Sequence, residues 1–272
     1  MKKTEYKAFY LYLGLVLILV LSVFAVFAPL LSPFDLHYYN LSDSFLSPNT
    51  THWFGCDFEG RDIFTLVLYG ARVSLGIALV VTLVSFVLGS LLGLCGALCR
   101  GPIDNAILFL TDVFLAFPSF LFAIAVAAFL RPSISNVIFI LSLKGWVSYA
   151  RLIRGQALSL REQAYVQSSI ALGASKSRIA FKDLLPNMLG PLVINASFGM
   201  AGVIMIESSL SFLGLGVPAG TPSWGALLDQ GTQYLLIAPH LSFFPGLCIM
   251  LVVLAFNFLG DGLRDRFVPD TK

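Results

Sequence analysis

The side chains that most often do chemistry are scarce in this sequence and lie far apart along it. Its three histidines are His37, His52 and His240, and none has a serine or cysteine partner at the spacing of a known nucleophilic motif. The phosphate-binding pattern G-x-x-x-x-G-K-[ST] is absent, so the chain does not bind a nucleotide through a P-loop. We therefore expect no catalytic residue and no enzyme activity in this chain.

Metal chemistry is not indicated either. The cysteines Cys56, Cys95, Cys99 and Cys248 have neither metal-ligand spacing nor the pattern of a disulfide framework, so all four are interpreted as packing residues. An acidic, glycine-rich stretch at 55–62 could suggest a calcium loop, but it lacks the alternating oxygen ligands and the final glutamate of an EF-hand. We expect neither a metal nor an organic cofactor.

The composition indicates an integral membrane protein. Of 272 residues, 57% are hydrophobic and 12% are charged, whereas a soluble domain averages about 25% charged residues. The mean hydropathy is +0.86. The net charge is only +2 and no basic tract is interleaved with aromatic residues, so nucleic acid is not an expected partner. The expected fold class is all-α, embedded in a lipid bilayer.

Apolar runs long enough to cross a bilayer, which takes about 20 helical residues, predict six spans. The first, from Ala8 to Phe34, is uncharged and too long for the apolar core of a signal peptide, which is about 7–15 residues. The others are expected at about 72–100, 104–130, 134–151, after Pro186 to Glu207, and after His240 to Gly260. The predicted regions are 1–31 (N-terminal tail and first helix), 32–72 (extracytoplasmic loop), 73–265 (a core of five helices with a cytoplasmic loop at 156–187) and 266–272 (cytoplasmic tail).

Lysine and arginine give the expected orientation, because they accumulate in cytoplasmic loops. Most of them lie on one predicted side, in the N-terminal tail, the 151–182 loop and the C-terminal tail, together with Arg100. The opposite side holds Arg61, Arg72 and Arg131. We expect both termini in the cytoplasm.

The polar stretch 159–187 is predicted to be a small folded unit. Ser159 is followed three residues later by Glu162, which is the pattern of a capping box and places a helix start just after Ser159. Gly173 is a natural end for that helix, because glycine readily takes the left-handed conformation common at helix ends.

A second short helix is expected after this glycine. Ser175 can cap it, and Pro186 is expected to close it before the next apolar run. Basic side chains surround the two predicted helices, which indicates a docking surface: they are Arg161, Lys176, Arg178 and Lys182.

The same stretch resembles the cytoplasmic loop of binding-protein-dependent ABC importer permeases. In that family the loop carries Glu-Ala-Ala, a glycine six residues after the glutamate, and a proline thirteen residues beyond the glycine. Gly173 and Pro186 hold this spacing, whereas Gln167, Ser168 and Ser169 replace Glu-Ala-Ala. The resemblance implies a coupling helix that docks in a cleft of an ATPase subunit, through Ala164, Tyr165, Gln167, Ser168, Ser169, Ala171, Leu172, Gly173, Ala174, Ser175, Arg178 and Pro186.

Other motifs extend the resemblance over most of the chain. The stretches 55–62 and 68–75 resemble the N-terminal signature of the peptide/nickel branch, with Cys56 in place of the usual threonine. The stretch 149–155 matches Tyr-Ala-Arg-x-x-Arg-Gly, and 257–265 resembles the closing signature. The resemblance implies a type I ABC importer permease fold in a bacterial inner membrane. It also implies a second permease subunit, two ATP-binding subunits and an extracytoplasmic substrate-binding protein as partners.

Glu207 invites a functional interpretation, because ionisable groups within a bilayer are costly. It precedes the stretches 208–216 and 222–225, which also resemble the family, and a structural carboxylate and a substrate-path residue are equally open here. The glycines that follow indicate irregular backbone, which is tolerated at membrane depth only where it is buried or lines an aqueous cavity. The outer gate and substrate path are expected at Glu207, Ser211, Phe212, Gly214, Gly216 and Trp224.

Two further charges fall within predicted spans. Asp112 lies near the inner part of the third span, where a partner from the basic loop can reach it. Lys144 is a charge not expected at this position in the family. Its long stem lets it snorkel toward water, or it pairs with an acid of the partner permease.

The expected function is to form the translocation path for dipeptides or oligopeptides, with ATP hydrolysis on a separate subunit. The alternative is a permease of the same family for nickel or another small solute. The rival class is a membrane enzyme or a six-helix channel outside the ABC family. An enzyme would need convergent His, Asp or Glu residues or metal ligands at one membrane face, which the sequence does not show. A channel would need a repeated pore motif and symmetric self-assembly.

Overall fold

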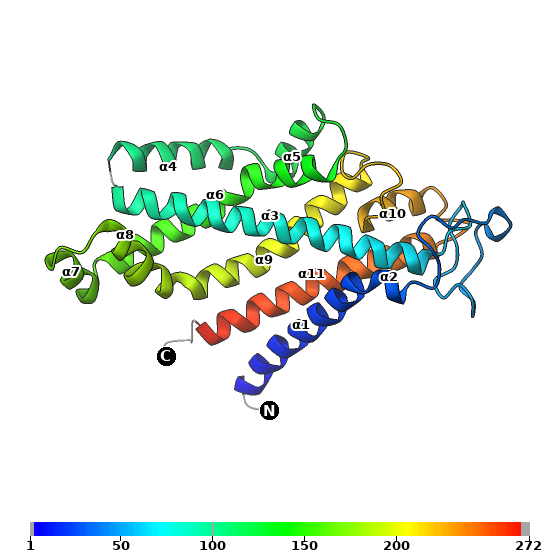
Figure 1. The fold of residues 1–272 in the computed structure, drawn as a ribbon, viewed down its shortest axis with the longest axis horizontal. Coiled ribbons are helices and arrows are strands. Elements are labelled where there is room, and N and C mark those ends of the chain that lie inside the picture. The colour runs from blue at the N-terminus through cyan, green and yellow to red at the C-terminus, as the bar shows by residue number, and fades with distance from the viewer. Residues whose placement is uncertain (1–2, 100, 268–272) are drawn as a thin grey trace.

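The computed structural model describes residues 3–99 and 101–267, and over this part the chain is helical with no β-sheet (Figure 1). Lys2, Arg100, Lys272 and the rest of the predicted tail at 268–272 lie outside the described residues. The long helices are α1 (Lys3–Val26), α3 (Ile63–Cys99), α6 (Ile134–Arg161), α9 (Leu185–Phe212) and α11 (His240–Phe267). The shorter ones are α2 (Ala28–Leu31), α4 (Pro102–Leu115), α5 (Ser119–Ala127), α7 (Ala164–Ala171), α8 (Lys176–Arg178) and α10 (Trp224–Thr232).

The prediction of an all-α membrane fold with six spans is confirmed. Within the described residues, five helical stretches are long and apolar enough to cross a bilayer, and the number rises to six when α4 and α5, bent by 84° at the break between them, are counted as one broken span. The bend falls at Pro118, whose backbone is extended (φ −57°, ψ 133°). Proline lacks an N–H and disfavours a helical conformation in the residue before it, so the helix breaks at this position.

The helix α3 begins at Ile63, nine residues before the expected start at Arg72. The first turn is capped by Asp62, whose side chain accepts a hydrogen bond from the Thr65 amide over 2.8 Å. The next residues are apolar and buried, and Leu66 is only 4% exposed. The loop after the first span therefore ends at Asp62, because packing extends the helix beyond the apolar run expected from the sequence.

The capping box predicted at Ser159 is wrong. Ser159 lies inside α6, which continues to Arg161, and α7 begins only at Ala164 with no side-chain cap on its first turn. The reason is tertiary packing: the α6 residues Ile153 and Ala157 are fully buried, so the helix continues well past the expected end at Arg151.

Pro186 does not close a helix as predicted; it lies in the first turn of α9. Proline fits there because the N–H groups of a first helical turn have no intrahelical partner. The preceding residues Ile179–Leu184 form a π-helix, a wider turn that joins α8 to α9. The result is one helical stretch from Lys176 to Phe212.

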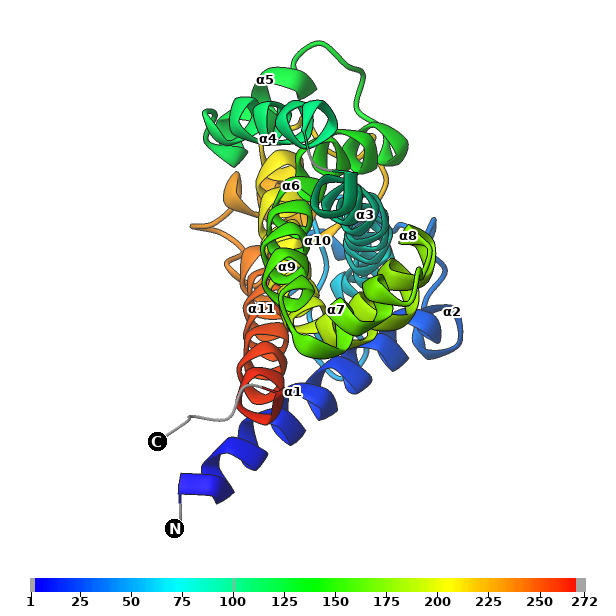
Figure 2. The ribbon, with the colours of Figure 1, turned by 90° about the vertical axis from the view of Figure 1, so that its left-hand side faces the viewer.

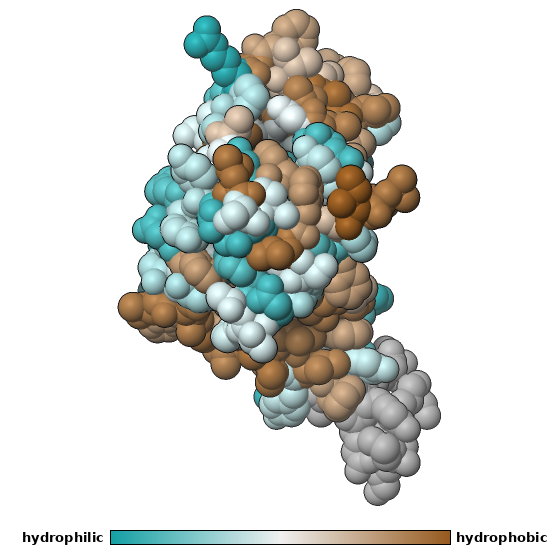
Figure 3. Space-filling model, turned by 90° about the vertical axis from the view of Figure 1, so that its right-hand side faces the viewer, coloured by the Kyte–Doolittle hydropathy of each residue, from teal (hydrophilic) through white to brown (hydrophobic). Residues whose placement is uncertain are grey.

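The helices α3, α6, α9 and α11 run along the length of the molecule (Figure 1). The helices α7 and α8 lie at one end, here called the α7 end, and α10 and the loop before α3 lie at the other, the α10 end. The N-terminal end of α1 and the C-terminal end of α11 both point toward the α7 end (Figure 1). Figure 2 looks onto that end, with α4 and α5 on one side of α9 and α1 on the other. Figure 3 shows hydrophilic residues gathered on the α10 end, as expected of a surface in water.

Two glycines allow α3 and α6 to pack closely. A Cβ atom on Gly93 would lie 2.6 Å from the Ala150 carbonyl oxygen, and one on Gly89 would run into the Trp146 carbonyl. Small residues four apart let two membrane helices approach each other backbone to backbone. This close contact fixes the position of α6, which leads directly into α7.

Candidate functional site

The segment 162–187, which we call the α7–α8 segment, is anchored to the helix bundle by one apolar face. Val166 on α7 is fully buried, and it joins a cluster that includes Ile179 and Leu184 of the π-helix and Ile153 of α6. Apolar burial of this kind contributes roughly 1.5–3 kcal/mol for each large side chain. The segment is therefore a packed part of the fold.

The opposite face of the same segment is accessible. Leu172 is 89% exposed and Tyr165 is 45% exposed, although both are apolar in large part. All the residues that the sequence singled out for coupling are exposed or partly exposed: Ala164, Tyr165, Gln167, Ser168, Ser169, Ala171, Leu172, Gly173, Ala174, Ser175, Arg178 and Pro186. The structure brings them together on one end of the molecule.

The turn between α7 and α8 has the predicted geometry. Gly173 adopts φ +79°, a left-handed conformation that disfavours residues with a Cβ atom. Ser175 caps α8, since its hydroxyl accepts a hydrogen bond from the Arg178 amide over 3.3 Å. The predictions of a glycine helix end and of a serine cap are both confirmed.

Polar contacts tie α7 to the long helices on both sides of it. The Gln167 side-chain amide donates a hydrogen bond to the Arg161 carbonyl at the end of α6 over 2.8 Å. The Tyr165 hydroxyl accepts one from the Asn187 side chain on α9 over 3.2 Å. A glutamate at position 167 has no donor for the Arg161 carbonyl, so the departure from the family pattern adds a contact between α6 and α7.

At the α10 end, Glu207 is fully buried and surrounded by serine hydroxyls. Ser74 on α3 donates to one carboxylate oxygen over 3.0 Å, and Ser211 donates to the other over 2.8 Å. Ser208 also donates, over 3.4 Å. Buried carboxylates need such partners, and here the partners join α3 to α9.

Trp224 begins α10 and is also fully buried. Its indole Nε1 donates to the Val67 carbonyl on α3 over 3.1 Å, and its backbone amide donates to the Ser74 hydroxyl over 3.3 Å. A Cβ atom on the adjacent Gly225 would run into the Ser208 backbone of α9. The helix α10 is thereby held tightly against both α3 and α9.

The residues predicted for the substrate path divide into two groups. Four of them are buried in this structure: Glu207, Ser211, Gly216 and Trp224. A solute would reach these residues only after the helices around them moved apart. Phe212 is 39% exposed, and Gly214 is exposed with φ +72°.

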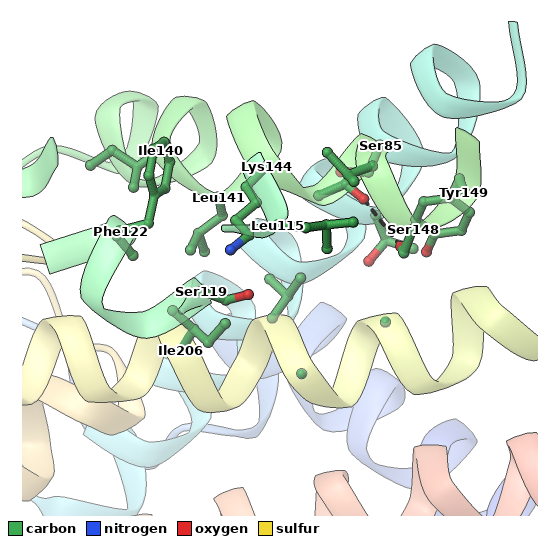
Figure 4. A pocket seen from close by; sticks show the side chains of 17 residues that line it. Ser85, Leu115, Ser119, Phe122, Ile140, Leu141, Lys144, Ser148, Tyr149 and Ile206 are labelled. Atoms are coloured by element: carbon green, nitrogen blue, oxygen red, sulfur yellow. Dashed lines mark hydrogen bonds between the residues drawn. The ribbon is translucent and has the colours of Figure 1, made fainter. Parts of the chain in front are cut away.

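Lys144 lines a cavity of about 230 Å³ between α3, α5, α6 and α9 that sequence reasoning did not find (Figure 4). Its ammonium group donates to the Phe117 carbonyl at the break between α4 and α5. The isolated charge in an apolar span was the only sequence signal, since the walls of the cavity come from four distant stretches.

Two ion pairs connect the bent α4–α5 pair to α6. Arg154 binds the Asp104 carboxylate with two nitrogens, Nε to Oδ1 at 2.6 Å and Nη2 to Oδ2 at 2.7 Å. Arg151 approaches Asp112 at 3.6 Å, with both side chains more than half exposed. Asp112 thus has a basic partner near the α7 end, as expected.

The loop at the α10 end is closed around Cys56, which is fully buried. Burial, with Asp62 and other carboxylates nearby, raises the pKa of its thiol to about 12. His52 lies 3.0 Å from Asp62. In the part of the chain that the structure describes, no group of three or more His, Cys, Asp or Glu residues could hold a metal ion.

Sequence families match two stretches of the chain. Residues 85–272 match the binding-protein-dependent transport system inner membrane component. Residues 12–48 match the N-terminal transmembrane domain of oligopeptide transport permease C.

Curated relatives are similar over almost their full lengths. The dipeptide transport system permease protein DppC of Alkalihalophilus pseudofirmus is 40% identical over 259 residues, which is 95% of this chain and 85% of that protein. The glutathione transport system permease protein GsiD of Pectobacterium atrosepticum is 38% identical over 260 residues, which is 95% of this chain and 86% of that protein.

A solved structure shares the fold. The MetNI methionine ABC transporter in an inward-facing conformation aligns with a TM-score of 0.60 and 21% identity, over 75% of this chain and 96% of the solved chain. The predicted type I importer fold is therefore confirmed. The chain is the membrane component of its transporter, and the ATPase is a separate subunit. Matched by the family model over more than half of its length, the chain belongs to the binding-protein-dependent transport system inner membrane components, as a permease subunit of an ABC importer.

Proposed function

We propose that this permease carries short peptides and receives the energy of ATP hydrolysis through the α7–α8 segment. The observation that carries the proposal is the exposed apolar residue Leu172, 89% exposed at the C-terminal end of a helix whose other face is anchored by the fully buried Val166. Two further large apolar side chains of the same segment are exposed, Tyr165 at 45% and Phe181 at 55%, and several exposed apolar side chains on one packed segment are typical of a docking surface. The partner that fits a permease is its ATPase subunit.

The contacts of α7 support transmission along the bundle. Because Gln167 is bonded to the end of α6 and Tyr165 to α9, a displacement of α7 would move both long helices together. Rigid-body rotation of packed helices is a common form of switching between two states. ATP-driven closure of the ATPases would then alternate the path between inward-facing and outward-facing conformations.

The relatives support the substrate class. DppC is named for dipeptide transport and GsiD for glutathione transport, and glutathione is itself a short peptide. We infer that the solute of this chain is a dipeptide or another short peptide, delivered by a substrate-binding protein at the α10 end.

The proposed assembly holds one copy of this chain, a second permease subunit and two ATP-binding subunits in a bacterial inner membrane. Both chain ends point toward the α7 end, and the basic residues of the sequence gather there as well. The positive-inside rule then makes the α7 end and both termini cytoplasmic.

The test is peptide-stimulated ATP hydrolysis by the complete transporter in proteoliposomes. Leu172→Asp places a charge in the docking contact and is expected to lower the stimulation at least tenfold while the permease still inserts. Leu172→Met keeps an apolar side chain of similar size and serves as the control. Full stimulation in Leu172→Asp would contradict coupling through α7, and absence of peptide uptake by the wild-type transporter would contradict the substrate class.

A further inference from the structure

Lys144 carries a charge near the middle of the membrane-spanning helix α6, and no described acidic residue pairs with it. It lies ten residues after the start of α6, or about 15 Å along a helix that rises about 1.5 Å per residue, which is half of a hydrocarbon layer about 30 Å thick. No acidic side chain among the described residues forms an ion pair with it. A charged side chain at this depth is costly and is retained where it serves a pathway or a ligand.

The Lys144 ammonium group has donors to spare. An ammonium carries three N–H donors, and one of them is directed to the Phe117 carbonyl. In Figure 4 its nitrogen points into the cavity, toward the hydroxyl of Ser119 on the facing helix α5. The remaining donors are therefore available to a group that enters the cavity.

Three hydroxyl groups on the cavity wall also lack partners. Thr82, Ser85 and Tyr149 are 6%, 2% and 3% exposed, and their oxygens make no hydrogen bond within the chain. Buried hydroxyls without partners are uncommon in folded proteins, because each costs free energy. Their oxygen atoms are enclosed by protein atoms in this conformation, so a ligand would reach them only if the walls of the cavity moved apart.

Two of these hydroxyls pack directly against glycines. A Cβ atom on Gly199 would lie 2.6 Å from the Tyr149 hydroxyl, and one on Gly145 would run into the Ser85 hydroxyl. The two glycines therefore let α6 approach α9 and α3 closely at this wall of the cavity.

The cavity is divided into chemically different parts. In Figure 4, Lys144 and Ser119 lie between an apolar group, formed by Phe122, Ile140 and Leu141, and the hydroxyls of Ser85 and Tyr149. The volume of about 230 Å³ is far above the roughly 10–15 Å³ that a single water molecule needs. It has room for one amino-acid residue of a ligand.

We propose that this cavity is a subsite for the C-terminal residue of the transported peptide, an inference that rests on the proposed peptide substrate. Lys144 and Ser119 bind the terminal carboxylate. The apolar walls accept the side chain. A terminal carboxylate is common to all unmodified peptides, so this contact accepts many sequences and rejects solutes without an anionic end.

The experiment measures binding of radiolabelled Ala-Phe and of its C-terminal amide to the detergent-purified permease–ATPase complex, without the substrate-binding protein, by equilibrium dialysis. The wild-type complex is expected to bind the free acid about tenfold or more tightly than the amide, since the amide lacks the charge that pairs with lysine. Lys144→Met should remove this difference and Lys144→Arg should largely keep it. Arg131→Met removes an exposed charge elsewhere and should leave the difference unchanged.

Two outcomes would overturn the subsite. They are equal binding of acid and amide by the wild type, and an unchanged difference in Lys144→Met. Uptake of Ala-Phe by the complete transporter in proteoliposomes separates the two proposals. Uptake together with any of these outcomes rejects the subsite alone, and absence of uptake rejects the peptide substrate.

Discussion

Ser74 on α3 and Glu207 on α9 are joined by a hydrogen bond of 3.0 Å in the interior of the protein. The same Ser74 hydroxyl accepts a bond from the Trp224 amide on α10 over 3.3 Å. A single buried hydroxyl therefore connects three helices at the α10 end. This arrangement favours a structural role for Glu207, which helps to hold α3, α9 and α10 together where the outer gate is expected.

Replacing Glu207 should test that role. Glu207→Ala leaves the Ser74 and Ser211 hydroxyls without an acceptor and opens a small cavity, so we expect a loss of about 3 kcal/mol or more in stability. Glu207→Gln keeps the shape and one carbonyl acceptor, and should lose less. Thermal unfolding of the purified transporter complex gives both values. A Glu207→Ala protein of wild-type stability that no longer imports peptide would instead support a direct role in the substrate path.

Two glycines on α3 offer a matched pair of substitutions that tests how closely α3 packs against α6. Gly93→Ala would place a Cβ atom 2.6 Å from the Ala150 carbonyl, and backbone cannot move aside cheaply, so we expect a loss of about 1–3 kcal/mol. Gly76→Ala is the control, because no atom lies within 4 Å of the added methyl group. It should be neutral, or should stabilise the helix by up to about 1 kcal/mol. Equal melting temperatures for the two variants would contradict the close contact between Gly93 and the Ala150 carbonyl.

The two Asp–Arg pairs should differ in strength. Asp104 and Arg154 form two short bonds with side chains 13% and 23% exposed, whereas Asp112 and Arg151 are 3.6 Å apart and 64% and 54% exposed. Bidentate, partly buried ion pairs contribute more to stability than exposed ion pairs, which contribute about 0–1 kcal/mol. Double-mutant cycles with Asp→Asn and Arg→Gln changes should give a larger coupling energy for Asp104–Arg154, and a larger value for the exposed pair would refute this ranking.

Cys56 should resist alkylation to unusually high pH. Burial is the main cause that raises the thiol pKa to about 12, and the negative charge of Asp62 is the second. The thiol of an unfolded cysteine has a pKa of about 8.5. Since the thiolate is the reactive form, N-ethylmaleimide should label the unfolded chain at pH 8.5 but leave Cys56 of the folded chain unmodified.

The same pKa shift has a consequence for stability. Between pH 9 and the folded pKa of about 12 the folded chain keeps a proton that the unfolded chain releases. The stabilisation is therefore complete below the unfolded pKa and is lost as the pH rises toward 12. Cys56→Ala should remove this part of the pH dependence of the melting temperature; an identical dependence in that variant would contradict the assignment.

Much of the fold and of the α7–α8 segment follows from the sequence because the signals are local. An apolar run of sufficient length must cross the bilayer as a helix, since no water is present to satisfy its backbone. A helix end that needs a positive φ favours glycine, and Gly173 takes φ +79°. The exposed motif around it lies on a short stretch of chain, so its residues come together whatever the rest of the fold does.

Other features depended on residues far apart in the chain. The expected helix start at Ser159 was overruled by burial of Ile153 and Ala157, because packing against neighbouring helices outweighs a local capping pattern. The sequence left two roles open for Glu207, and its partner Ser74 is 133 residues away. Likewise, the sequence shows Lys144 as a single charge within an apolar span. The cavity beside it exists only because α3, α5, α6 and α9 meet there. The sequence by itself thus determined the membrane-spanning helices and the exposed motif of the α7–α8 segment, and only the tertiary structure decided which buried polar groups meet, since that depends on how helices pack across the bundle.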